Sequence, residues 1–282
     1  MEFDLYQIDS FTDQTFHGNP ACVVPLKSWL SDEILLNIAK ENAVAETAFF
    51  VENENGFHLK WFTPEIEMDL CGHATLAAAH AIKTILNYEP DTIAFTTLSG
   101  ELKVILADGI YWLDFPSRPP VNADMPDVIR LALNLQPKQV LKSRDLVLVY
   151  DSEDEIKNIE VNRQIFDQIN LDPGGVIVTA KGNTVDFVSR FFTPQSTILE
   201  DPVTGSAHCS LIPYWADRLN KSKMNAVQLS DRTGQLICLN VGKRVLIGGN
   251  AKTYSIGKFW IDNAIFSDNS FFTHTIAAGC KR

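Results

Sequence analysis

Short stretches in which apolar and polar residues alternate recur along the chain, with glycines between them. β-branched and aromatic residues dominate these stretches, which is typical of half-buried strands. In the first half they cover residues 57–62, 92–97, 101–106 and 110–115. After Pro126 the same pattern returns in residues 146–150, 175–180, 186–192, 235–240, 244–248 and 254–261. The sequence therefore predicts more strands than helices.

Three stretches have the longer period of a helix. Residues 32–41 follow a favourable N-cap, Ser31, and carry a single apolar stripe. Residues 72 to about 86 and 205 to about 219 are apolar nearly all round, which is typical of a helix buried inside a domain. Pro213 lies inside the last of these, so a kink or an early end of the helix is expected there.

One series of motifs occurs twice. Phe-Thr-Pro at 62–64 and 192–194 is followed each time by a short acidic loop, and then by Gly-polar-Ala at 72–74 and 205–207. The offsets are 130 and 133 residues (192 − 62 and 205 − 72), which is too long a period for a solenoid. The repetition predicts two homologous halves, each a curled, mostly antiparallel sheet around one central helix.

A proline-rich stretch, 116–120, separates the two copies and has the composition of a linker. We therefore expect a first domain over residues 1–116 and a second over residues 117–282. Whether the last 18 or so residues return to the first domain is left open by the sequence.

The charge balance limits the possible partners. Lys and Arg total 24 and Asp and Glu total 35, so the formal net charge is 24 − 35 = −11. A general nucleic-acid binder has the opposite sign and a basic run, so we expect no nucleic-acid partner. The longest apolar stretch, residues 74–86, is interrupted by polar residues and is shorter than a membrane span, so we expect no membrane association.

The five cysteines are odd in number, irregularly spaced and without a Cys-x-x-Cys pair. This pattern argues against a disulfide framework and points to a reducing compartment. The N-terminus reads as neither a signal nor a transit peptide. We therefore expect a cytoplasmic protein.

The two helix starts at Gly72 and Gly205 are candidates for anion binding. Helix N-termini that face each other would point free backbone N–H groups into one cleft, and such groups bind a carboxylate. The alternative is that each glycine only begins a buried helix. If the cleft exists, valine at Gly205 should weaken carboxylate binding with the fold intact, and loss of any single surface Lys or Arg should matter much less.

A metal site could in principle use Cys71, His73, His80, His208 and Cys209, but none of the usual ligand spacings is present. No dinucleotide or Walker motif occurs either. We therefore expect neither a metal nor a cofactor.

Glu46 is the only charged residue in the apolar run 43–51. A carboxylate in such a place either turns outward to water or is partly buried with a raised pKa, the state that a general acid/base needs. The residues themselves leave both alternatives open.

Four ordered motifs are similar to those of a known family. They are Asp9-Ser-Phe-Thr with Gly18-Asn19-Pro, Glu46-Thr-Ala-Phe, Phe62-Thr-Pro with Asp69-Leu-Cys-Gly-His73, and Glu200-Asp-Pro-Val-Thr-Gly-Ser206-Ala. Together they resemble the PhzF (phenazine biosynthesis) isomerase family, which has the fold of diaminopimelate epimerase. The resemblance implies an α+β fold of two pseudosymmetric domains, each a β-barrel wrapped around a central helix. It also implies an active site between the domains, and a homodimer.

The resemblance further implies roles for individual residues. Glu46 matches the proton-shuttling glutamate of the family. The polar residues around it are matched by His73, Asp201 and Ser206. Substrate binding is implied for Asn19 and for the N–H groups beside Gly72 and Gly205.

One departure separates the chain from the related two-thiol epimerases. Cys71 occupies one thiol position, but Thr204 occupies the other, and a hydroxyl is far too weak an acid for that role. We therefore expect a cofactor-independent isomerase that moves a proton on a small carboxylic acid with Glu46 as its one base. The alternative is a non-catalytic protein that keeps the pocket and binds a small carboxylate or a protein partner.

Overall fold

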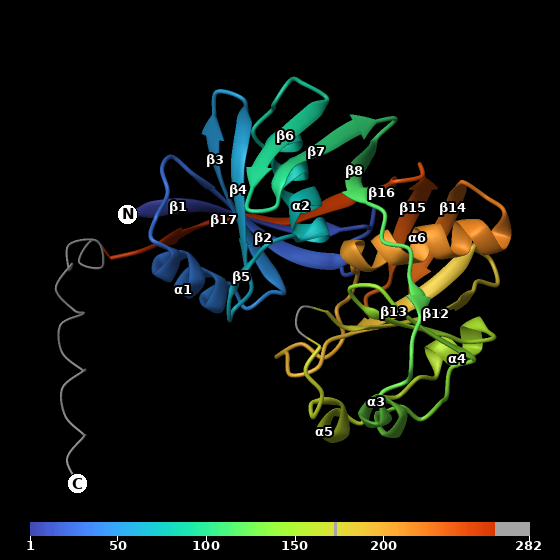
Figure 1. The fold of residues 1–282 in the computed structure, drawn as a ribbon. Coiled ribbons are helices and arrows are strands. Elements are labelled where there is room, and N and C mark those ends of the chain that lie inside the picture. The colour runs from blue at the N-terminus through green and yellow to red at the C-terminus, as the bar shows by residue number, and fades with distance from the viewer. Residues whose placement is uncertain (172–173, 263–282) are drawn as a thin grey trace, which may run out of the picture.

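The computed structural model describes residues 1–171 and 174–262 (Figure 1). Its strands form one continuous 17-stranded sheet, and within the described residues six helices accompany it. The fold is therefore a sheet-rich α+β fold, as expected.

The first half holds eight of the strands and two helices. Their bounds are β1 (Glu2–Ser10), β2 (Asn19–Leu26), α1 (Asp32–Asn42), β3 (Glu46–Asn53), β4 (Gly56–Phe62), β5 (Glu67–Met68), α2 (Gly72–Thr84), β6 (Thr92–Thr97), β7 (Gly100–Ala107) and β8 (Ile110–Pro116). Ser31 caps α1 as expected, because its side chain accepts a hydrogen bond from the backbone of Ile34.

The second half adds nine strands and four helices. Their bounds are β9 (Val121–Asn122), α3 (Asp127–Ala132), β10 (Gln139–Lys142), β11 (Leu146–Val149), α4 (Glu153–Lys157), α5 (Arg163–Phe166), β12 (Val176–Lys181), β13 (Phe187–Phe192), α6 (Gly205–Leu219), β14 (Lys223–Gln228), β15 (Gly234–Asn240), β16 (Arg244–Gly249) and β17 (Ala251–Trp260). The alternation pattern did not predict β1, β2, β10, β14 or the short helices α3, α4 and α5.

The two halves repeat one strand plan. In the first, β2 and β3 pair in parallel, β4 returns antiparallel to β3, and the chain enters α2. In the second, β11 and β12 pair in parallel, β13 returns antiparallel, and the chain enters α6. Each helix is followed by three strands paired as an antiparallel meander, β6–β8 and β14–β16. The last strands of the two meanders, β8 and β16, pair with each other.

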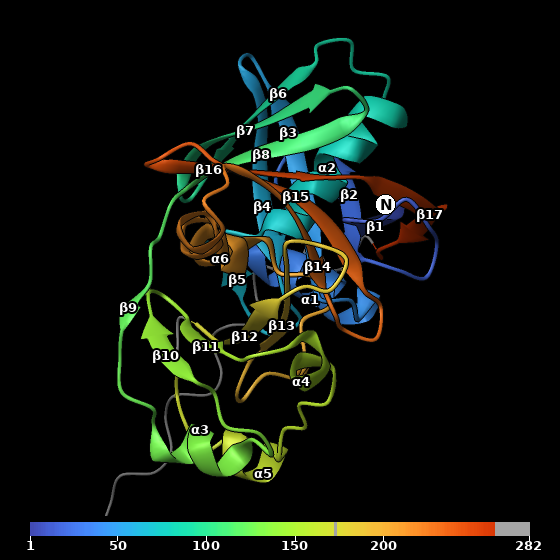
Figure 2. The same ribbon diagram turned by 90° about the vertical axis from the view of Figure 1, so that its right-hand side faces the viewer.

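Two chain segments connect the halves. After β8 the chain descends past α6 to β9, which pairs with β10 of the second half (Figure 2). After β16 the chain returns to the first half, where β17 pairs with β1 over nearly its whole length. The domain boundary near residue 116 remains a prediction, and residues 265–282 lie outside the described part of the chain.

The helices α2 and α6 are largely buried within the two halves, as their all-round apolar sequences predict. In α6, Trp215 stacks on the buried ring of Phe187 with 5.9 Å between centroids and donates a hydrogen bond to Thr179. Aromatic rings of this kind bring a large apolar area and a defined geometry to a core. Both helices are therefore rigidly seated.

Pro213 neither ends nor breaks α6, which runs without interruption from Gly205 to Leu219. The expected early end is therefore wrong. Proline has no N–H, so the carbonyl of Cys209, four residues earlier, lacks its helical donor. The backbone N–H of Arg118, in the segment between β8 and β9, donates to that carbonyl at 2.9 Å. The linker thus supplies the hydrogen bond that the proline removes.

The four described cysteines are free, and Cys280 lies outside the described residues. Within that described part, no helix is long and apolar enough to cross a membrane.

Two histidines are held neutral by the cores. His208 is fully buried on α6, and its Nδ1–H donates to the carbonyl of Thr204 at 2.9 Å. Burial lowers the pKa of His208 to about 4. His80 on α2 contacts Tyr111 and Thr253, and burial, with some help from Lys252, lowers its pKa to about 4 as well. Each histidine must therefore take up a proton on unfolding at mildly acidic pH.

We predict that the free energy of unfolding falls as the pH drops from 6.5 towards 4. Between these values an unfolded histidine is protonated and the native one is not, so acid favours unfolding by up to about 1.4 kcal/mol per pH unit for His208. Urea unfolding between pH 7 and pH 4 measures this slope. His208→Gln keeps a donor for the Thr204 carbonyl but cannot be protonated, so its slope should be shallower. Equal slopes in both proteins would contradict the prediction.

Candidate active site

The N-termini of α2 and α6 meet at two glycines. A Cβ atom placed on Gly72 would lie 3.3 Å from the Cα of Gly205, and one placed on Gly205 would lie 3.4 Å from the Cα of Gly72. This close approach brings the free N–H groups of both first turns to one place. The two helix starts therefore face each other, as the repeated motif predicts.

Glu46 and His73 face each other beside this contact. Glu46 is the first residue of β3, and His73 is the second residue of α2. Glu46 Oε2 lies 3.0 Å from His73 Nε2, with 15% of the glutamate side chain and 4% of the histidine side chain exposed. Neither atom has a hydrogen bond of regular geometry. The pair is thus nearly dry, yet keeps polar atoms free for a further partner.

Asn19 connects this pair to the second half of the chain. It is fully buried at the start of β2, and its Nδ2 donates to Asp201 Oδ1 at 2.7 Å and to the carbonyl of Val203 at 3.0 Å. The same nitrogen lies 3.1 Å from His73 Nδ1. Because a donor group faces Nδ1, the proton of a neutral His73 is favoured on Nε2, towards Glu46.

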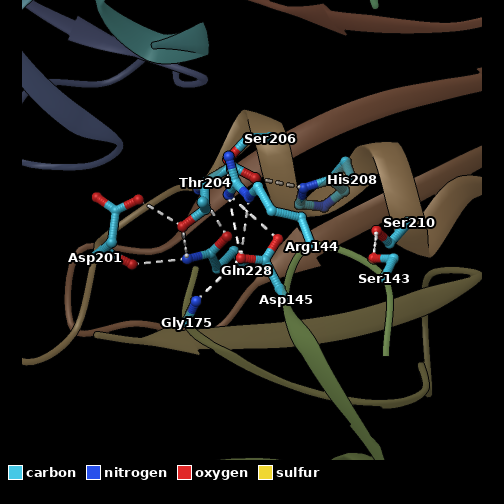
Figure 3. A network of polar contacts seen from close by, with 10 residues as sticks. All are labelled: Ser143, Arg144, Asp145, Gly175, Asp201, Thr204, Ser206, His208, Ser210 and Gln228. Atoms are coloured by element: carbon cyan, nitrogen blue, oxygen red, sulfur yellow. Dashed lines mark hydrogen bonds and ion pairs between the residues drawn. The ribbon is translucent and has the colours of Figure 1, made fainter. Parts of the chain in front are cut away.

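Asp201 is held at the start of α6 by several donors. Thr204 Oγ1 donates to its Oδ2 at 2.5 Å, and Gln228 Nε2 donates to its backbone carbonyl at 2.7 Å (Figure 3). Burial raises the pKa of Asp201 to about 6, and the nearby Glu46 carboxylate adds to the rise. The positive charge of His73 and the hydrogen bonds act in the opposite direction.

Cys71 lies on the other side of His73, with Sγ 3.6 Å from Nδ1. Burial, and then the Glu46 carboxylate, raise the pKa of the Cys71 thiol, so the thiol stays protonated near neutral pH. Burial alone would lower the pKa of His73, but its acidic neighbours outweigh that effect and raise it. With Cys71 neutral, the carboxylate of Glu46 is the neighbour that favours a protonated His73.

The strand register identifies the second-half position that corresponds to Glu46. Phe62 pairs with Thr47 in the first half, and Phe192 of the second Phe-Thr-Pro motif pairs with Val176. The residue before Val176, which corresponds to Glu46, is Gly175. A Cβ atom there would lie 2.7 Å from the carbonyl oxygen of Phe192, so the position accepts no side chain without a backbone shift. The second half therefore has no acid/base at this place.

Within the described part of the chain, Ser206 makes no hydrogen bond with Glu46 or His73. Its hydroxyl instead accepts a hydrogen bond of 3.0 Å from Arg144 Nη2 (Figure 3). The structure thus brings Asn19, Glu46, His73 and Asp201 together and places Ser206 in a second network. That network adds two residues which the motifs did not indicate, Arg144 and Asp145. A third such residue, Gln228, hydrogen-bonds with Asp201 of the first group and with Thr204.

Known proteins support this architecture. The family model for phenazine biosynthesis-like proteins (PhzC-PhzF) matches residues 8–257. The chain belongs to the PhzF family. An uncharacterized isomerase of Pseudomonas aeruginosa is 45% identical over 258 residues, which covers 91% of this chain and 98% of that protein. A PhzF family crystal structure from Enterococcus faecalis has a TM-score of 0.88 at 42% identity and covers 93% of this chain and 100% of that one.

A more distant match extends the fold beyond the PhzF family. A hydroxyproline epimerase structure from Agrobacterium vitis has a TM-score of 0.60 at 10% identity, with 94% of each chain covered, and shows the fold alone. The isomerase names of close PhzF-family relatives show that this protein is an isomerase.

The metal-ligand candidates from the sequence are not gathered at one place. His80 and His208 have the separate partners described above, and Cys209 is buried on α6. Within the described residues, one group offers three ligand atoms within 4.8 Å of one another: Glu46, Cys71 and His73. The set contains two of the candidate ligands and would suit zinc rather than magnesium.

Two surface hollows lie away from this site. Both are open and flank the linker and α6, and the residues that line them include Pro119, Pro213 and Asp217. Neither is lined by Glu46 or His73. The paired helix starts and the partly exposed Glu46 therefore define the candidate active site better than surface shape does.

The contact between the glycines changes what a substitution at Gly205 does. From the sequence we expect Gly205→Val to leave the fold intact. The structure leads to a different prediction, because a Cβ atom at Gly205 would already lie 3.4 Å from the Cα of Gly72 and 3.7 Å from the ring of Phe11, and the two methyl groups of valine extend beyond that atom. We predict that this variant is destabilised by about 1–3 kcal/mol, the usual cost of overpacking.

Thermal unfolding checks the prediction. Gly257→Val is the matched control, because no atom lies within 4 Å of a Cβ atom at that position on β17. The control should unfold close to the wild type. Unfolding of Gly205→Val at the wild-type temperature would show that the two helix starts do not touch.

Proposed function

We propose that this PhzF-family isomerase moves a proton between two carbons of a small carboxylic acid, with Glu46 as its single base and without a cofactor. The observation that carries the proposal is the Glu46–His73 pair, whose facing atoms lie 3.0 Å apart and lack a regular hydrogen bond. Such a pair combines a carboxylate with a neighbouring N–H group in a nearly dry place, where acid/base chemistry is most effective.

The proposed reaction balances within the substrate and one side chain. Glu46 takes a proton from a carbon next to an electron-withdrawing group, so a C–H bond breaks and an O–H bond forms. The same carbon also neighbours a carbon–carbon double bond of the substrate, so the released electron pair spreads over that bond as a dienolate. Glu46 then returns the proton on the same face to the far carbon of the double bond, so the O–H bond breaks, a new C–H bond forms and the double bond shifts by one position. His73 Nε2–H, directed at the carboxylate, positions it between these two steps.

The second half offers no partner for a two-base reaction. Gly175 stands at the position that corresponds to Glu46, and Thr204 at the position that corresponds to Cys71. The thiol of Cys71 is itself disfavoured as a base, since burial raises its pKa. These features support a single-base transfer over the two-thiol reaction of the related epimerases.

Asn19 and Asp201 act as positioning residues in this proposal. Asn19 donates a hydrogen bond to Asp201, and its amide nitrogen also faces His73 Nδ1. Because that nitrogen cannot accept a hydrogen bond, a neutral His73 carries its proton on Nε2. The N–H groups at the starts of α2 and α6 are free for the substrate carboxylate, as helix N-termini are. A binding protein without catalysis would need no nearly dry carboxylate–histidine pair, so the site supports the enzyme over that alternative.

We predict that Glu46→Gln folds normally and loses substrate–solvent hydrogen exchange by about 10²–10⁴-fold, because the amide keeps the shape but cannot carry the proton. Deuterium incorporation from D₂O into a library of small carboxylates, followed by NMR, measures this. Glu52→Gln, an exposed glutamate on the same strand, is the control and should keep full exchange.

Cys71→Ser should lower exchange only mildly. Retained exchange in Glu46→Gln together with its loss in Cys71→Ser would move the acid/base role to the thiol and contradict the proposal. Tight binding of a carboxylate by the wild type with no exchange in the whole library would support the non-catalytic alternative.

We further propose that the protein is a cytoplasmic homodimer. The four free cysteines support a reducing compartment. β17 supports self-association, because within the described residues it pairs only with β1 and exposes Ile256 (64%) and Trp260 (70%). An edge strand with exposed apolar side chains readily adds a strand from a second copy.

We predict a solution mass of twice the 31.5 kDa of one chain, measured by gel filtration with light scattering. Ile256→Lys should lower it to that of a single chain, because a charge at the apolar edge opposes association. Val121→Lys, at a similarly exposed valine on β9, is the control and should keep the mass of the dimer. A single-chain mass for the wild type would contradict the dimer.

A further inference from the structure

Arg144 is fixed in place by a buried carboxylate. It lies two residues before β11, and its Nε and Nη2 donate to Asp145 Oδ1 at 3.2 and 3.1 Å. The side chain of Asp145 is 1% exposed, and the same oxygen also accepts the backbone N–H of Gly175 at 3.0 Å. A carboxylate with this many donors holds a guanidinium in one orientation.

The guanidinium of Arg144 extends from this anchor to the first turn of α6. Its Nη2 donates to Ser206 Oγ at 3.0 Å, and Figure 3 shows it lying between Ser206 and Thr204. The arginine side chain remains 25% exposed. Ser206 is only partly buried, although its neighbours Gly205 and Ala207 are buried. Among the described residues, Nη1 has no hydrogen-bond partner, so its two N–H groups are free.

The residue that Arg144 contacts corresponds, in the repeat, to the residue that Glu46 contacts. In the first half, the second residue of the central helix, His73, faces Glu46. In the second half, the corresponding residue, Ser206, faces Arg144. The two helix starts touch at their glycines, so the base of one half and the cation of the other lie on the two sides of one contact.

We propose that Arg144 binds the carboxylate of the substrate, so that the reacting carbons lie towards Glu46. This inference rests on the proposed function and adds the residue that orients the substrate. The two N–H groups of Nη1 can donate to a carboxylate. The hydroxyl oxygen of Ser206 accepts from Arg144 Nη2, which leaves the hydroxyl proton of Ser206 for the same carboxylate. The substrate carboxylate is then held by an arginine side chain and not by backbone N–H groups alone. This matters because the net charge of the protein is −11 and does not attract an anion.

Acetate is the direct probe of this site, because it is a small carboxylate. In protein labelled with ¹⁵N at arginine side chains, the Nε–H signal of Arg144, assigned with Arg144→Lys, should shift saturably with acetate. Acetamide, and sodium chloride at the same ionic strength, should not cause a saturable shift. The Arg244 signal, from an exposed arginine paired with Asp114, is the internal control and should not saturate. Equal behaviour of the Arg144 signal in acetate and chloride would overturn the proposal.

Kinetics provide the second test, with any carboxylate that shows deuterium exchange. Arg144→Met should raise KM by 10-fold or more and lower kcat less, and Arg244→Met should change neither. Because Arg144→Met leaves Asp145 without its cation, the double variant Arg144→Met/Asp145→Asn keeps the acceptor for Gly175 without the buried charge. It should show the same rise in KM, and a KM within twofold of the wild type would overturn the proposal.

The acetate titration also separates this inference from the proposed function. Glu46→Gln should keep the saturable acetate shift and lose exchange. If Glu46→Gln kept its exchange while the Arg144 shift stayed saturable, the single-base proposal would fail and the carboxylate site would stand. If Glu46→Gln lost its exchange and acetate caused no saturable Arg144 shift in any form of the protein, the carboxylate site would fail and the single-base proposal would stand.

Discussion

The contact between Gly72 and Gly205 is the constraint on which the rest of the structure depends. A larger residue at Gly72 would press on the first turn of α6, because a Cβ atom there lies 3.3 Å from the Cα of Gly205, and the methyl groups of a valine at Gly205 would extend towards Gly72 in the same way. The contact brings together free N–H groups from two helices that are 133 residues apart in the chain. It also places the residues that follow, His73 and Ser206, where polar chemistry can converge.

The duplicated fold is symmetric in its strands and asymmetric in its chemistry. The register aligns Glu46 with Gly175, so one half carries a carboxylate where the other has no side chain at all. The half without the base carries the Arg144–Asp145 pair instead. The two halves thus share one strand arrangement, but one carries the Glu46 carboxylate and the other the Arg144 guanidinium. A proton transfer on a single face of a carboxylate fits such a division better than symmetric two-base chemistry does.

The linker and the strands that pair between the halves fix the two halves relative to each other. β17 of the second half pairs with β1, so the first half is completed by a strand from the second, and β8 and β16 pair across the two halves. The N–H of Arg118 satisfies the carbonyl that Pro213 leaves free inside α6. Such backbone contacts hold a site between two halves more firmly than surface ion pairs would.

Much of this could be predicted from the sequence. The repeated Phe-Thr-Pro and Gly-polar-Ala motifs gave the two helix starts, and the isolated charge of Glu46 in an apolar run marked the carboxylate beside His73. Arg144 could not be found in this way, because its position follows from strand register and from the ion pair with Asp145, neither of which leaves a periodic signal. The early end of α6 at Pro213 was predicted wrongly for a related reason. The N–H group that replaces the missing helical donor belongs to Arg118, 95 residues earlier in the chain (213 − 118). The short helices α3, α4 and α5 depend on tertiary packing rather than on pattern.

The stereochemistry of proton return tests the central claim most directly. A carboxylate that shows exchange is converted in D₂O, and the face of the product that carries the new deuterium is determined by NMR. A single base at Glu46, with Gly175 at the corresponding position of the other half, predicts deuterium on the same face from which the proton was removed. Delivery to the opposite face would require a second acid in the other half of the molecule and would contradict the account.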